Sequence, residues 1–345
     1  MIFYQKYLWL FLLFSNGTIL AQKSNPTIYY QFTNKAEKEI CNNNYKEALK
    51  LYSQSFNFLE GPFTHDVYNA FVCSWLLGKP NHDYYKILRE RGVSKKFLIE
   101  VKKINVKTID SLERLTVIVP KINKGYRDTL NVMVNRDQSF RKYDDRYTTY
   151  ADTIKKIDNK NAIALVNLIN SNGFPSEKII GNDSNDLAHP IFFILIFHNA
   201  HGAKFQSVNF SSMIDKAIKD GKIDNRLGAQ LIDYSDGTDQ YGTASAGICY
   251  YYWEANHDKD SLANWALTSE NHKWYLMPLD SRTQIKYDKN REKYYLDNID
   301  DYRKKIQFQI KNSLFDFGLY GYKQTGGIAI KSEFDYMFKN LIEIK

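Results

Sequence analysis

The spacing of apolar residues predicts a chain built mainly of α-helices. Between Thr27 and Gly92, apolar positions recur every three or four residues, which is the period of a helix with one buried face. The first predicted helix buries apolar residues at these spacings, namely Ile28, Tyr29, Phe32, Ala36 and Ile40. Breaks at asparagines 42–44, at Gly61-Pro62 and at Gly78-Lys79-Pro80 divide the region into two helical hairpins.

One hairpin carries the residue pattern of a known repeat. The segment Asn44-Tyr45-Lys46-Glu47-Ala48-Leu49, with Tyr52 after it and Gly61-Pro62 at its end, resembles the tetratricopeptide repeat. Ala36 and Ala70 are 34 residues apart, which is the period of that repeat. The resemblance implies a surface that binds a protein or peptide. The alternative is that these helices only support the rest of the fold, because fewer than about three repeats rarely fold alone.

A strongly apolar segment marks the centre of the second half of the chain. Ile191 to Phe197 is apolar on every side, which predicts a buried helix with Pro190 in its first turn. Two further helices are expected after it. One is amphipathic and runs from Phe210 to Ile218, and the other is capped by Asp224 and precedes an acidic, glycine-bearing loop.

Two other segments complete the predicted fold. Upstream, Asp158 or Asn159 is expected to cap a helix whose apolar face runs from Ile163 to Ile169. Downstream, Ile248–Trp253 and Lys273–Met277 are aromatic and β-prone, and we expect them to pair as a small hairpin. The predicted fold class is therefore mainly α, with tetratricopeptide-like helical hairpins plus a helical domain with a small β-hairpin.

The first 21 residues have the order of a secretory signal peptide. Lys6 precedes an apolar run, Tyr7–Phe14, and a region of small and polar residues that ends at Ala21. We therefore expect cleavage after Ala21 and a secreted or periplasmic protein. The apolar run is too short to span a bilayer and no later stretch is apolar enough, so no transmembrane span is expected.

The rest of the chain is expected to divide near Pro120. The predicted parts are the hairpins at 22–100, a basic connector at 101–130, a helical domain at 131–310 and a C-terminal tail at 311–345. Between Lys95 and Arg127, nine Lys or Arg stand against three Asp or Glu, which indicates a solvated connector or a patch for an anionic surface. No nucleic-acid-binding motif accompanies this charge, so nucleic acid is not an expected partner.

The sequence offers little that would hold a metal or cofactor. Cys41, Cys73 and Cys249 are too few and too scattered for a disulfide framework or a metal site, although a single disulfide stays open. His198 and His201 are three apart, but they need a further ligand, such as an aspartate of the 233–239 loop, to bind an ion. Zinc-protease, P-loop and dinucleotide motifs are missing from the sequence. We therefore predict no metal and no cofactor.

Polar residues in the second half follow a second known order. They are Asp137-Gln138-x-x-Arg141, Asp158-x-x-Asn161, Gly173-Phe174-Pro175 with Gly181, His198, Asp233 and Gln240-Tyr241-Gly242-Thr243. This order resembles a bacterial domain family of unknown function. The resemblance implies the candidate catalytic residues His198, Asp137, Arg141 and Asp233, and the candidate binding residues Gln138, Gln240 and Tyr241. The chain departs from the family pattern at Phe197, Ala200 and Tyr234. If the family has an active site, these departures remove part of it.

His198 is the residue on which the functional prediction depends. It follows seven apolar residues, and a buried imidazole needs partners for both ring nitrogens. We predict that it contacts at least one of Asp137, Arg141, Asp233 and Gln240 and that these residues line one concavity.

Two function classes follow from the sequence. The first is a protein- or peptide-binding or scaffold module of the cell envelope, favoured by the hairpins. The alternative is a hydrolase-like enzyme with a polar pocket centred on His198.

Overall fold

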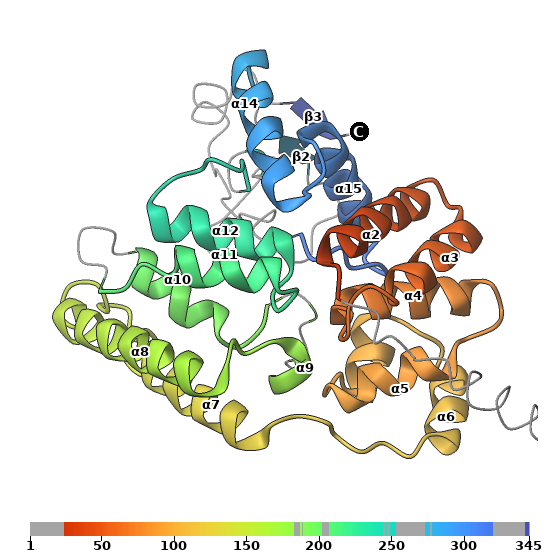
Figure 1. The fold of residues 1–345 in the computed structure, drawn as a ribbon, viewed down its shortest axis with the longest axis horizontal. Coiled ribbons are helices and arrows are strands. Elements are labelled where there is room, and N and C mark those ends of the chain that lie inside the picture. Colours follow the sequence, from red (N-terminus) through yellow and green to blue (C-terminus); the bar gives the residue numbers. More distant parts are fainter. Residues whose placement is uncertain are drawn as a thin grey trace, which may run out of the picture.

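The computed structural model confirms that the chain is mainly helical (Figure 1). It describes residues 24–182, 187, 189–201, 207–243, 246, 249–252, 273–276, 278–319 and 342–344. The predicted signal peptide lies outside these residues. Among the helices described here, none is both long enough and apolar enough to cross a membrane.

The N-terminal helices form the two hairpins that the apolar spacing predicts. They are α2 (Pro26–Cys41), α3 (Tyr45–Ser55), α4 (Thr64–Leu76) and α5 (His82–Glu90). Proline occupies the first turn of α2, and the Asn25 side chain accepts a hydrogen bond from the Ile28 N–H, which together begin the helix. The π-helix η1 (Phe97–Val101) and the helix α6 (Val106–Leu115) follow.

The second half begins with α7 (Lys124–Gln138), α8 (Ala151–Asn172), the short α9 (Glu177–Ile180) and α10 (Phe193–His201). Next come α11 (Ser211–Lys219) and α12 (Asn225–Asp236), which pack against each other. Asp224 caps α12 as predicted, because its side chain accepts hydrogen bonds from the N–H groups of Arg226 and Leu227. Gly237, with a φ of 63°, ends the helix in the left-handed conformation that glycine favours.

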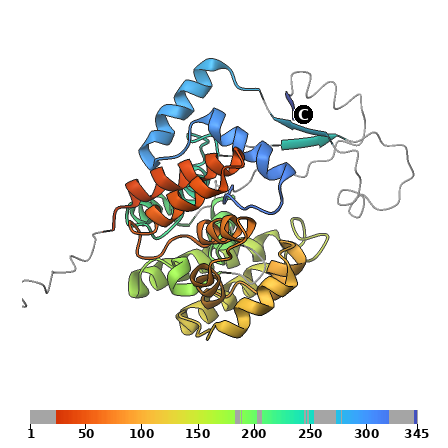
Figure 2. The ribbon, with the colours of Figure 1, turned by 90° about the vertical axis from the view of Figure 1, so that its right-hand side faces the viewer.

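The C-terminal part contains the helices α14 (Ser281–Arg291) and α15 (Ile299–Lys311), with the 3₁₀ helix η3 (Glu292–Tyr294) between them. Three short strands, β1 (Cys249–Tyr252), β2 (Lys273–Leu276) and β3 (Ile342–Ile344), form an antiparallel sheet in the order β1-β2-β3 (Figure 2). Cys249 faces Leu276 across the first pair, and Trp274 faces Ile344 across the second.

Two predicted helix starts are wrong. Asp158 does not cap a helix, because α8 begins at Ala151 and Asp158 lies inside it. Its carboxylate pairs with Arg141 and so does not compete for backbone N–H groups. The second start is displaced, because the Pro190 carbonyl accepts a hydrogen bond from the Phe193 N–H at 2.9 Å in a turn that precedes α10.

Two main clusters of buried apolar residues form the interior. One joins the first turns of α2 to helices α7 to α12, and the other joins α2 to α6 with α15 and the segment 315–319. The tail predicted from residue 311 therefore supplies Phe315, Phe317 and Leu319 to the core of the N-terminal hairpins. Helix α4 is buried at every residue from Thr64 to Ser74, so it is an internal helix of the whole molecule.

The contact between α2 and α3 depends on small residues. Ala36 and Ala48 are both fully buried in the same cluster. We predict that Ala48→Leu overpacks this contact and lowers the free energy of unfolding by about 1–3 kcal/mol. Urea denaturation followed by circular dichroism measures the change. Lys46→Leu, at an exposed position of the same helix, is the matched control. An unchanged unfolding curve for Ala48→Leu would contradict this account of the hairpin.

Candidate functional site

Helices α7, α8 and α10 meet around a group of polar side chains. Helix α10 contacts both of the other helices, and α7 contacts α8. Asp137 lies in the last turn of α7 and His198 near the end of α10, so both are held by regular backbone. Arg141 follows α7 in a turn, and Asp158 lies within α8. The structure thus brings together Asp137, Arg141 and His198, three of the residues singled out in the sequence.

The central contact of this group joins His198 to Asp137. The His198 Nδ1 atom lies 2.7 Å from the Asp137 Oδ2 atom. An ionised carboxylate only accepts hydrogen bonds, so a neutral His198 holds its proton on Nδ1 and keeps the lone pair of Nε2 available. The Asp137 side chain is 1% exposed and the His198 side chain 14% exposed. The prediction that His198 contacts at least one of the four named polar residues is confirmed.

Arg141 ties the two carboxylates of the site together. Its Nη1 atom donates to the Asp137 backbone carbonyl at 2.7 Å and lies 3.1 Å from Asp137 Oδ1. Its Nη2 atom lies 2.7 Å from both carboxylate oxygens of Asp158. Burial raises the pKa of the Asp158 carboxyl above its usual value, and the hydrogen bonds from Arg141 oppose that rise. Gln138 Nε2 also donates to Asp137 Oδ2, at 2.6 Å, so the orientation of Asp137 is fixed from several directions.

A pocket with a volume of about 420 Å³ opens beside this group. His198, Arg141 and Asp158 line it. One face of α8 supplies much of the remaining wall through Ala151, Ile154, Lys155 and Asn159. The pocket therefore presents an oriented imidazole together with charged, amide and apolar surface, which is the mixture that small-molecule sites use.

The sequence pattern includes Asp158, but sequence reasoning missed the rest of the α8 side of this pocket. Ala151, Ile154, Lys155 and Asp158 are spaced three or four apart, so they share one face of a helix. Extending the predicted helix back to Ala151 would have revealed this face. The expectation of a helix cap at Asp158 concealed it, because a cap residue points at backbone N–H groups rather than into a pocket.

The polar group also has the composition of a weak metal site. Asp137, Asp158 and His198 each offer a ligand atom, and these atoms lie within 4.8 Å of one another. Arg141 already supplies positive charge to both carboxylates, and an ion would have to displace it. The His201 side chain lies outside the described residues. The geometry therefore favours acid–base chemistry at His198 over metal binding.

Asp233, Gln240 and Tyr241 form a separate group that orders the loop after α12. The Asp233 carboxylate accepts hydrogen bonds from the backbone N–H groups of Gln240 and Tyr241, at 2.8 and 3.2 Å, and from the hydroxyls of Thr238 and Thr243. Burial raises the pKa of Asp233 to about 6, and these hydrogen bonds oppose the rise. These three residues are described in the structure but are not among those lining the pocket. The expectation of a single concavity is therefore wrong, because Arg141 and His198 line the pocket whereas Asp137, Asp233 and Gln240 do not.

The loop is fixed to the C-terminal helices as well. The Gln240 carbonyl accepts a hydrogen bond from Asn290 at 2.8 Å, and the Tyr241 carbonyl accepts one from Arg291 at 2.8 Å. Arg291 is 1% exposed, and its guanidinium lies over the Tyr302 ring at 4.6 Å. Its role here is structural, because it holds the loop against α14 and α15.

Two of the departures from the resembled family pattern contact each other. The rings of Phe197 and Tyr234 lie 5.0 Å apart with an interplanar angle of 73°. Edge-to-face packing of this kind stabilises aromatic pairs. An apolar contact between α10 and α12 thus stands where the pattern has a glutamine and an arginine.

Comparisons with known proteins give no relative for this chain. No family model, curated protein or solved structure matches it. Its function is therefore argued from the geometry of its own residues.

The hydrogen bonds of Asp233 generate a stability prediction. Asp233→Asn replaces an acceptor oxygen with an NH₂ group that faces N–H donors, so a buried donor loses its partner. We expect the free energy of unfolding to fall by about 1–3 kcal/mol. Denaturation in urea at neutral pH measures the loss, and Asp236→Asn, at the exposed end of α12, is the control. Equal stability of the two variants would contradict the loop-ordering role.

Proposed function

We propose that the pocket beside His198 binds a small polar ligand and that His198 exchanges a proton with it, as in a hydrolase-like enzyme. The observation that carries the proposal is the contact between Asp137 and His198 at the edge of a pocket of about 420 Å³. A carboxylate on Nδ1 fixes the imidazole tautomer and orientation, which leaves Nε2 as the proton-accepting atom.

The chemistry that follows is general acid–base catalysis. His198 Nε2 takes a proton from a water molecule or a ligand hydroxyl, and the buried Asp137 carboxylate stabilises the imidazolium that forms. Arg141 is a positioning residue, since it holds Asp137 through both its backbone carbonyl and its carboxylate. Lys155 and Asn159 of α8 line the pocket and are placed to orient a polar ligand.

A binding or scaffold role through the N-terminal hairpins has less support. Helix α4 is buried from Thr64 to Ser74, and α2 packs on α11 and α15. Much of the surface that a repeat would offer to a peptide is therefore turned toward the rest of the chain. This burial favours the alternative that the hairpins support the fold, while the pocket carries the ligand.

The proposed location is outside the cytoplasm. Its support is the order of Lys6, the apolar run and Ala21 in the first 21 residues. Mass spectrometry of the protein from its native source is predicted to find a mature N-terminus at Gln22. Recovery of soluble cytoplasmic protein that keeps Met1 would contradict export.

The acid–base role is tested with His198→Gln and Asp137→Asn. We expect the purified chain to turn over one class among p-nitrophenyl esters, phosphates and glycosides. Each substitution is expected to lower that rate by about 100-fold or more, because a positioned base contributes this much.

The control for this test is His82→Gln, which changes a partly exposed histidine of α5 and is expected to keep the rate. Melting temperatures establish that each variant is folded. Turnover that survives both site substitutions, or no turnover of any class, would contradict the enzyme proposal.

A further inference from the structure

A second histidine in an unusual environment is His65, in the first turn of α4. Its side chain is fully buried, and within the part of the chain that the structure describes neither ring nitrogen has a hydrogen-bond partner. The ring stacks on Phe63, with centroids 6.2 Å apart and planes at 3°. Gly318 also packs closely against the imidazole ring: a Cβ atom added to this glycine would lie 3.1 Å from the His65 Cε1 atom. Buried polar groups without partners are rare, so this imidazole needs a reason.

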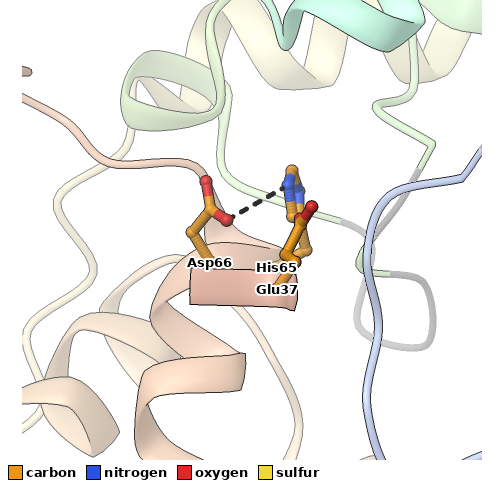
Figure 3. A group of neighbouring side chains, drawn as sticks. All are labelled: Glu37, His65 and Asp66. Carbon is orange, nitrogen blue, oxygen red and sulfur yellow. Dashed lines mark ion pairs between the residues drawn. The ribbon is translucent and has the colours of Figure 1, made fainter. Parts of the chain in front are cut away.

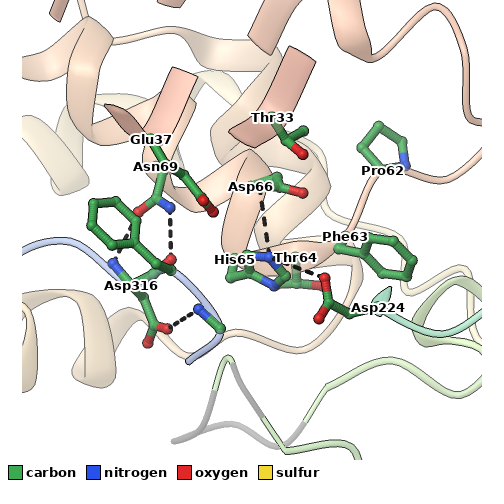
Figure 4. Close-up of polar contacts among 12 residues, drawn as sticks. Thr33, Glu37, Pro62, Phe63, Thr64, His65, Asp66, Asn69, Asp224 and Asp316 are labelled. Carbon is green, nitrogen blue, oxygen red and sulfur yellow. Dashed lines mark hydrogen bonds and ion pairs between the residues drawn. The ribbon is translucent and has the colours of Figure 1, made fainter. Parts of the chain in front are cut away.

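Two carboxylates flank the imidazole. The His65 Nε2 atom lies 3.6 Å from Asp66 Oδ1 and 3.8 Å from Asp224 Oδ2. Figure 3 shows Asp66 and Glu37 beside the ring, and Figure 4 shows Asp224 as its further partner. Both distances are longer than hydrogen bonds, but they are within the range of ion pairs. Asp66 Oδ1 is itself buried without a hydrogen-bond partner, so it is placed to receive a positive charge.

Charged groups face His65 from each element packed around it. They are Glu37 of α2, Asp66 of α4, Glu177 of α9, and Asp224 and Arg226 at the start of α12, with Asp316 in the covering segment, residues 315–319. Asp316 is neutralised by Lys102 at 3.2 Å, and Glu37 binds both Arg226 and Lys305.

Among the described residues, the two carboxylates beside His65 have no other positive charge in direct contact. Within this part of the chain, neither Asp66 nor Asp224 forms an ion pair with a lysine or arginine, whereas Glu37 and Asp316 do. An uncompensated charge is costly in the interior, and histidine is the side chain that gains a proton most readily near neutral pH.

We infer that His65 is ionised in the native fold and that this charge is a pH-sensitive latch holding residues 315–319 over α4. The covering segment contributes the buried side chains Phe315, Phe317 and Leu319 and lies on the His65 ring through Gly318. Asn69 secures it by a hydrogen bond to the Asp316 carbonyl at 2.6 Å and by accepting one from the Asp316 N–H at 2.9 Å. Loss of the imidazolium leaves Asp66 and Asp224 with unpaired negative charge beneath this segment.

The electrostatic setting agrees with this geometry. Burial lowers the pKa of His65, but Asp66 and Asp224 raise it by more, so the pKa lies above the usual histidine value. Burial raises the pKa of Asp66 to about 6, so this carboxyl is still mainly ionised at neutral pH. A metal ion would have to take Glu37 from Arg226 and Lys305, so a proton is the simpler source of the charge.

The direction of the pH dependence follows from the raised pKa. The stabilisation from His65 is fully present below the histidine pKa of the unfolded chain, about 6.5, and is lost as the pH rises through the higher pKa of the folded state. The covering segment is therefore latched near neutral pH, where Asp66 is still mainly ionised, and released under alkaline conditions.

The test is nitrogen NMR of the histidine imidazoles in the full chain, together with amide hydrogen exchange of residues 317–319. At neutral pH we expect both His65 nitrogens to carry protons. Exchange at Gly318, corrected for its intrinsic pH dependence, is expected to speed up on alkalinisation, by about tenfold for each unit of pKa elevation that is lost. His65→Gln is expected to lack this dependence, while His82→Gln keeps it.

If His65→Gln does not fold, a second variant tests the same inference. Asp224→Asn retains an acceptor for the cap of α12 but removes one negative neighbour, so it is expected to lower the pH at which His65 loses its proton. A single neutral tautomer of His65 at neutral pH would overturn the inference. Exchange at Gly318 that does not depend on the ionisation of His65 would overturn the latch.

Discussion

The fold depends most on one buried carboxylate, that of Glu37. Arg226 Nη2 lies 2.8 Å from both of its oxygens, and Lys305 Nζ lies 2.5 Å from one of them. All three side chains are at most 5% exposed. Taking these charges out of water costs several kcal/mol per ion, so the arrangement is stable only when every partner is in place. The geometry of α2, α12 and α15 is therefore fixed by the need to satisfy this group.

The residues that bind Glu37 also bind other parts of the chain. Lys305 also binds Asp297, and Arg226 donates to the backbone carbonyl of Phe317 in the covering segment. The far end of α12 carries Asp233, which orders the loop held by α14. Helix α10 packs on α12 and carries His198 to the pocket. The structural centre and the candidate site are thus linked by two helices, although their polar groups are separate.

How much of this was predictable depends on the range of each interaction. The N-terminal helices follow from apolar spacing alone. The ion pair of Asp137 with Arg141 is also local, because Arg141 lies four residues further on, in the turn that follows α7. The contact of His198 with Asp137 came from their order in a resembled pattern, because a separation of 61 residues carries no local signal. Asp158 was misread because its residue type favours helix caps, whereas its position was decided by Arg141 in the tertiary structure.

The Glu37 network was not predicted because its members are far apart in the chain. Arg226 is 189 residues from Glu37 and Lys305 is 268 residues away. The only sequence signal is a glutamate next to Ala36 and one turn before Ile40, on the apolar side of the first predicted helix.

The central claim is that the buried charge of Glu37 holds the N-terminal hairpins to the C-terminal helices. The most direct measurement is the free energy of unfolding of Glu37→Gln, from urea denaturation followed by circular dichroism. Removing one partner of a buried ion network leaves the other charges uncompensated, so a loss of about 3–5 kcal/mol is predicted. Glu47→Gln, which breaks an exposed pair with Lys50, is expected to cost at most about 1 kcal/mol. Equal small losses in both variants would contradict the account.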